Sequence, residues 1–228
     1  MIVSAGSLIF SAPTVFFTLF IAVGLALLLG VTFHEFSHSM VAHRLGDNTS
    51  SRLGRMSLNP KVHLDPMGTM MVLLVGFGWG KPVPVNPSRL RGGRYGEAAV
   101  SAAGPISNLI LACLFSFPFR MGWIDVPLTM YPPSIFEPTF FISYLLYVGL
   151  TLNLVLAIFN LLPFAPLDGS ALLAGIAPKN WLHIVSKVQM AGPIILITVI
   201  VLDFLLGYRI VSQIIGPPVD WMTWLLIG

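Results

Sequence analysis

The sequence predicts an all-α polytopic membrane protein with about four transmembrane helices and one re-entrant or β-hairpin-like membrane loop. Apolar residues make up 56% of the 228 residues and charged residues only 9%, whereas about a quarter of the residues in soluble domains are charged. Apolar stretches of about 18 residues or more recur along the chain, and each can cross the roughly 30 Å hydrocarbon core of a bilayer. The net charge of +3 is spread over short loops, which indicates membrane topology and argues against nucleic acid as a partner.

The first half of the chain predicts one spanning helix and one membrane loop. A helix is expected over residues 13–45, and Gly46 and Asp47 end it. Residues 48–65 are polar and basic, and their weak alternation predicts a short hairpin in water or headgroups. The apolar residues 67–75 are too few to span comfortably, because even about 15 helical residues rise only some 22 Å, less than the roughly 30 Å hydrocarbon core. Because the flanking loops are basic and a run of glycines and prolines follows, we expect a re-entrant segment that borders a cavity.

The second half predicts three further spanning helices, over residues 97–119, 139–162 and 188–208. Residues 120–137 contain three prolines and two acidic residues, and they predict a loop on the side opposite to the basic loops. The tail carries Trp221 and Trp224, which is typical of an interfacial anchor. The positive-inside rule assigns the basic stretches 44–94 and 179–187 to the cytoplasm and both termini to the outside.

One short motif within the first predicted helix brings together residues that commonly bind zinc. Residues 34–38 read His-Glu-Phe-Ser-His, and on a helix the two histidines lie about 40° apart, one turn from each other on the same face. They can therefore share one metal ion. Glu35 points beside that metal, which suits a base acting on water. Ionisable residues in a membrane helix are costly and by default mark function.

A catalytic zinc site needs a third protein ligand, and Asp168 is the strongest candidate. The prolines before it keep the chain out of regular helix, and Gly169 permits a turn, so the carboxylate can point sideways at a metal. Asp203 lies in the last predicted helix without a polar neighbour motif, and Asp65 lies in the basic loop. The alternative role for Asp168 is an N-cap of the segment that follows it.

Three sequence elements together are similar to those of the site-2 protease family of intramembrane zinc metalloproteases. The first is the H-E-x-x-H of residues 34–38, and the second is the N-x-x-P-x-x-x-L-D-G of residues 160–169. The third, Gly104 to Asn108, resembles the middle G-x-x-x-N element of that family. The resemblance covers residues 31–171. We expect a single membrane protease domain over residues 1–228, and the chain departs from larger members of the family in having no room for a PDZ or other soluble domain.

The resemblance also implies roles for individual residues. It gives one zinc ion per chain, with the ligands His34, His38 and Asp168. Glu35 is the expected base, and Asn160 is expected to act beside the scissile carbonyl. Asn108, through the resemblance, and His63, as a residue that could line the entrance, are candidates for support of the substrate or the oxyanion.

These observations predict an intramembrane zinc metalloprotease that hydrolyses peptide bonds within or near transmembrane segments of membrane proteins. Its partners would be a substrate with a transmembrane helix and the lipid bilayer. We expect a multi-pass protein of a prokaryotic cell membrane, with the active site toward the cytoplasmic side. The alternatives are a membrane metal-binding or transport protein, or an inactive scaffold, that uses the same ligand cluster.

Overall fold

The computed structural model describes residues 11–75, 78, 80–127, 138–207 and 209–228. These residues form helices and no strand, which confirms the all-α class. Five helices within the described part are long and apolar enough to cross a membrane: α2 (Pro13–Arg44), α5 (Arg94–Arg120), α6 (Pro138–Asn160), α8 (Leu182–Leu206) and α9 (Ile210–Ile227). Shorter helices lie between them: α3 (Thr49–Arg52), η1 (Pro60–Val62), α4 (Pro66–Val75), η2 (Pro87–Arg89), α7 (Asp168–Ile176) and η3 (Lys179–Trp181).

The C-terminal tail is a fifth long helix, so the count of about four spanning helices is not confirmed. Both carboxylate oxygens of Asp203 accept backbone N–H groups of the first turn of α9, those of Ile210 and Val211. This caps α9, while Gly207 in the left-handed conformation ends α8. The tryptophans of the tail therefore lie on a helix that packs against α6. Residue 208, the predicted end of the fourth helix, and residues 128–137 of the predicted loop lie outside the described residues.

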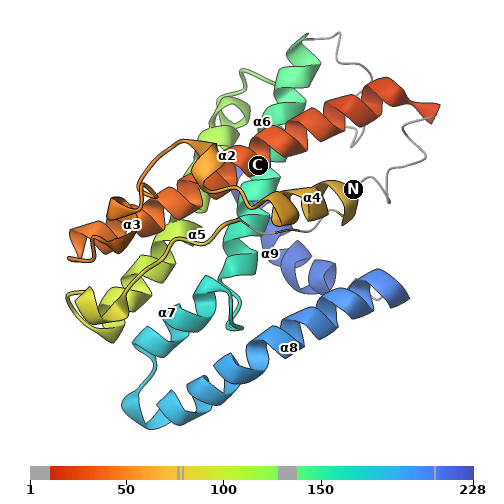
Figure 1. Cartoon of the computed structure of the whole chain (residues 1–228). Coiled ribbons are helices and arrows are strands. Elements are labelled where there is room, and N and C mark those ends of the chain that lie inside the picture. The colour runs from red at the N-terminus through yellow and green to blue at the C-terminus, as the bar shows by residue number, and fades with distance from the viewer. Residues whose placement is uncertain (1–10, 76–77, 79, 128–137, 208) are drawn as a thin grey trace.

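The core of the fold is the packing of α2, α5 and α6, with α9 behind α6 (Figure 1). Small residues allow close approach, as is common between membrane helices. Ala22 and Ala26 of α2 are buried against Tyr144 and Val148 of α6. A Cβ atom on Gly30 would lie 2.8 Å from the Leu156 side chain. Helices α2 and α6 are therefore in close contact one turn before His34.

Helix α8 lies at the edge of the bundle, with α7 between it and α5 (Figure 1). Several large apolar side chains of α8 remain exposed, among them Met190, Ile194 and Leu205. In a membrane protein such a face suits lipid, because lipid tails solvate apolar side chains without cost. This position keeps α8 away from the polar centre of the bundle.

The hairpin predicted over residues 48–65 is wrong. Asp47 accepts hydrogen bonds from both the backbone N–H and the hydroxyl of Thr49, which starts α3 instead. Asn59 accepts the backbone N–H of Lys61 and caps η1. Asx-type bonds of this kind favour short helices and turns over strands, and the weak alternation of polar residues did not reveal them.

The two ends of the segment that contains α4, near residues 64 and 80, lie next to each other. Leu64 and Gly80 form an antiparallel bridge, and Lys81 donates its backbone N–H to the His63 carbonyl at 2.7 Å. The two ends of the segment are thus joined, as a re-entrant or hairpin-like loop requires. Residues 76–77 and 79, within the predicted glycine run, lie outside the described residues. The re-entrant path itself stays a prediction.

Labelling of introduced cysteines tests that prediction. With Cys113→Ala as background, Ser57→Cys and Ser88→Cys should react with a membrane-impermeant maleimide from the same side. The reason is that the C-terminal end of α2 lies beside the N-terminal end of α5. The backbone N–H of Arg91 donates to the Leu45 carbonyl there, at 2.8 Å. Asp125→Cys, beyond the far end of α5, is the control and should react from the other side. Labelling of the first two from opposite sides would make α4 part of a spanning segment.

Candidate metal centre

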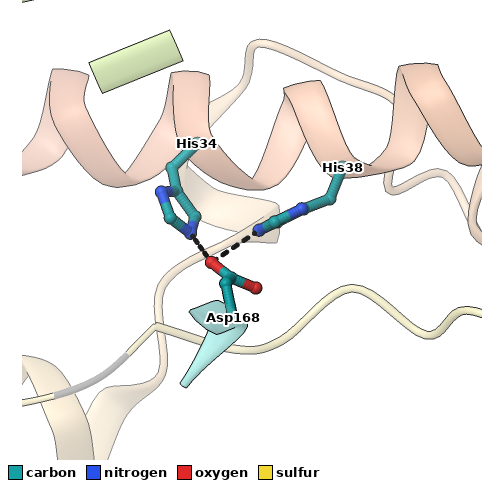
Figure 2. A group of neighbouring side chains, drawn as sticks. All are labelled: His34, His38 and Asp168. Atoms are coloured by element: carbon teal, nitrogen blue, oxygen red, sulfur yellow. Dashed lines mark ion pairs between the residues drawn. The ribbon is translucent and has the colours of Figure 1, made fainter. Parts of the chain in front are cut away.

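Two histidines of α2 and one aspartate of α7 form the polar centre of the bundle. His34 and His38 are buried, with 7% and 8% of their surfaces exposed. Their Nε2 atoms lie 3.0 Å and 3.3 Å from the same oxygen, Oδ2 of Asp168. Figure 2 shows the two rings pointing from α2 toward the carboxylate. One ligand atom from each residue lies within 4.8 Å of the other two.

Hydrogen bonds on the far side of each ring fix which nitrogen faces the centre. Nδ1 of His38 lies 2.7 Å from the Val100 carbonyl, which can only accept, so Nδ1 carries the proton. Nδ1 of His34 lies 2.7 Å from Oδ1 of Asn108. The amide of Asn108 is oriented by its Nδ2, which donates to the Gly30 carbonyl at 3.1 Å. In the neutral rings, both Nε2 atoms therefore present lone pairs to the centre.

The donor set fits a cation. Oδ2 of Asp168 is buried and has no hydrogen-bond donor among the described residues. Its nearest polar neighbours are the Nε2 atoms of the two histidines, so two nitrogen lone pairs and a carboxylate oxygen point toward one position. Protonating both rings would place two positive charges side by side at membrane depth. A zinc ion would instead satisfy the two nitrogen lone pairs and the carboxylate together.

Helix α5 supplies the room for this centre. A Cβ atom on Gly104 would collide with Nε2 of His38 and would lie 2.6 Å from Nε2 of His34. Asn108, which holds His34, follows one helical turn later on the same face. The G-x-x-x-N element is thus a pair in which the glycine admits the two rings and the asparagine orients one. The sequence marked the element, but its position behind the ligands is a result of helix packing.

A cavity of about 270 Å³ opens beside the three residues. Glu35 and Asn160, the other residues predicted to act, both line it. Oε2 of Glu35 accepts the backbone N–H of Val83 at 3.0 Å, and Asn160 donates from Nδ2 to the Leu156 carbonyl at 2.9 Å. Val83 belongs to the strap, the residues 81–86 that cross one side of the cavity. The glycine and proline run predicts a segment that borders a cavity, but it does not predict the contact of Val83 with Glu35.

The two candidates for substrate or oxyanion support lie elsewhere. Asn108 is fully buried behind His34 and is not among the residues that line the cavity. His63 is also fully buried, and its Nε2 lies 2.7 Å from the Ser57 carbonyl. The structure therefore gives Asn108 contacts that orient a ligand, and it gives His63 contacts that hold the loop before α4.

The alternatives to Asp168 as third ligand have other partners. Asp203 caps α9, and Asp65 accepts the backbone N–H of Gly68 at 2.8 Å, in the first turn of α4. Asp168 itself is the first residue of α7, and the position before it, Leu167, is the N-cap. The carboxylate of Asp168 makes no capping bond. Of the three aspartates, Asp168 is the one that meets the histidines.

Comparison with known proteins agrees with this chemistry. The chain is 36% identical over 179 residues to "Putative zinc metalloprotease YwhC" of Bacillus subtilis (strain 168), an alignment that covers 78% of each protein. The chain belongs to this zinc metalloprotease family. It is also 26% identical over 196 residues to "Putative zinc metalloprotease Rip2" of Mycolicibacterium smegmatis, an alignment that covers 79% of the chain and 71% of that protein. No family model and no solved structure matches the chain.

For this zinc metalloprotease, Gly104→Ala should weaken metal binding. The added methyl group must displace rings that are pinned by their Nδ1 bonds, so both Nε2 atoms move. Disturbing the support of metal ligands typically costs 10-fold to 100-fold in affinity, and we expect that loss in a competition assay with a zinc chelator. Gly24→Ala is the matched control, because a Cβ there meets nothing within 4 Å. Equal zinc affinity in the two variants would contradict the close approach of α5.

Proposed function

We propose that this zinc metalloprotease is an intramembrane enzyme of the site-2 type, which hydrolyses peptide bonds within or near transmembrane segments of membrane proteins. The observation that carries the proposal is the placement of His34, Glu35 and His38 on a helix long and apolar enough to span a membrane, with Asp168 opposite them. From His34 to Arg44, the first cationic residue after it, is ten positions, or about 15 Å of helix. The reaction would therefore take place below the surface of the bilayer.

The roles of the side chains follow from their positions. His34, His38 and Asp168 would hold one zinc ion, which when bound supplies a Lewis acid that polarises the scissile carbonyl and makes water easier to deprotonate. Glu35 accepts the proton from water and delivers it to the leaving amine. The Val83 N–H keeps the Glu35 carboxylate at the cavity wall. Asn160 offers its amide to the oxygen on which negative charge develops.

The size of the cavity favours an unwound substrate. A helix with its side chains is about 10–12 Å wide, whereas the cavity holds only about 270 Å³. An extended segment of a few residues matches that space better. A substrate helix must also release its carbonyl groups from hydrogen bonds before hydrolysis. We therefore expect substrates with helix-weakening residues at the cut.

The chemistry of the site favours hydrolysis over the alternatives. A metal carrier or a scaffold could use the same three ligands, but neither needs a carboxylate beside the metal and a cavity that leads to it. The basic stretch around residues 44–94 supports a site that opens toward the cytoplasm of a prokaryotic cell. The partners would be the lipid bilayer and a membrane protein with a transmembrane helix.

Reconstitution tests the proposal. Purified protein in detergent is mixed with a panel of single-span membrane proteins that differ in glycine and proline content, and fragments are measured by mass spectrometry. We expect cuts inside or next to the spans, loss of cutting with a zinc chelator, and recovery when zinc is added back. Cutting confined to soluble segments, or no chelator-sensitive cutting across the panel, would count against an intramembrane protease.

A further inference from the structure

The cavity beside the metal centre carries more negative charge than the metal can balance. Its charged lining groups are Glu35, Asp168 and a third carboxylate, Glu97 of α5. Neither lysine nor arginine is among the described residues that line it. The two charges of a zinc ion would offset Glu35 and Asp168, with the histidines neutral. Glu97 leaves the loaded cavity with one negative charge in excess.

The Glu97 carboxylate has no partner within the described part of the chain. It makes no hydrogen bond and no ion pair there, although Glu97 is only partly exposed. The cations nearest to it in sequence are engaged with carbonyl groups. Arg94 donates to the Ala177 carbonyl at 2.8 Å, and Arg91 donates to the carbonyls of Arg44 and Leu45. The charge of Glu97 is therefore available to a molecule in the cavity.

Glu97 also lies in the first turn of α5, where the helix dipole favours an acidic residue. That effect stabilises the helix modestly and falls off within its first turn. It does not require the side chain to line the cavity. A purely helical role predicts an effect on stability without any preference for the charge of the substrate.

The distance from the metal centre sets where a substrate would meet this carboxylate. Glu97 precedes Gly104 by seven residues, two helical turns or about 10 Å along α5. An extended chain rises roughly 3.3 Å per residue, so a side chain about three residues from the scissile bond would reach Glu97. The N-terminal end of α5 carries the basic loop, and the flanks of spanning helices on the cytoplasmic side are rich in lysine and arginine.

We propose that Glu97 determines specificity by binding a lysine or arginine of the substrate, about three residues from the scissile bond on the cytoplasmic side. This inference rests on the proposed function. A cation there would pair with the excess charge, and the same cation marks the membrane flank of a spanning segment. The pair would thus fix how far the substrate enters the cavity before it is cut.

Charge exchange tests the proposal. Two versions of one cleaved substrate carry lysine or glutamine at the position about three residues from the cut, and their rates of cleavage are compared as a ratio. Wild-type protein should prefer lysine about twofold to fivefold, the range of a partly exposed ion pair. In Glu97→Gln the ratio should fall to about one. In Glu97→Lys a substrate with glutamate should be preferred over one with lysine.

The control and a binding measurement separate this proposal from the proposed function. Asp125→Asn removes an acidic charge that does not line the cavity, and it should keep the preference for lysine. Binding of the two substrates to the Glu35→Gln protein, followed by cross-linking, needs no cleavage and should show the same preference. Equal binding of the two substrates, or a preference that persists in Glu97→Gln, would overturn the role of Glu97. Cleavage of both versions would meanwhile leave the protease assignment intact.

Discussion

Glu35→Gln should lower the rate of cleavage by about 10²-fold to 10⁴-fold, the usual contribution of a general base, while zinc stays bound. The glutamine keeps the shape of the side chain, and its amide oxygen can still accept the Val83 N–H that Oε2 of Glu35 accepts now. What disappears is the carboxylate that takes the proton from water. The measurement is paired, with zinc content and fragment formation determined for wild type and variant in the same detergent.

The same variant separates the protease from its alternatives. A metal carrier or a scaffold would move or hold its ligand much as before, because Glu35 is not one of the three residues that meet around the metal position. Glu97→Gln serves as a comparison, since it also neutralises a glutamate of the cavity but leaves the base in place. The rate of cleavage should fall far less in Glu97→Gln than in Glu35→Gln. Cleavage by Glu35→Gln at close to the wild-type rate would show that the mechanism is wrong.

Combined His34→Ala and His38→Ala substitution should reduce bound zinc from about one ion per chain to almost none. A zinc site of this type needs three protein ligands, and the double variant leaves only Asp168. Asp168→Ala should also lose zinc, since the two histidines alone make an incomplete site. Metal analysis of the purified proteins by mass spectrometry measures the content directly.

A histidine outside the cluster provides the control for metal content. His43 lies on the same helix, five positions after His38 and about 140° around it, and its side chain is exposed. His43→Ala should therefore keep zinc at the wild-type level. Full zinc content in the double histidine variant would refute the ligand assignment, whatever the activity of that protein.

The sequence alone determined the residues closest to the metal position. Helical periodicity puts His34 and His38 on one face whatever surrounds the helix. The prolines before Asp168 keep it out of the preceding helix in any fold. The apolar stretches likewise determine a membrane protein, because so few charges cannot cover a soluble surface. Such features depend only on neighbours in the chain, so they can be predicted before the fold is known.

Only the tertiary structure decided what surrounds those residues. The bonds that orient the two histidines join residues 74 and 62 positions apart, and the bond from Val83 to Glu35 spans 48 positions. Asp203 caps α9, the fifth long helix. The hydrogen bonds of Asp47 start a short helix where a hairpin was predicted over residues 48–65. Contacts of this kind arise when separate helices and loops pack together. No local period or spacing in the sequence encodes them.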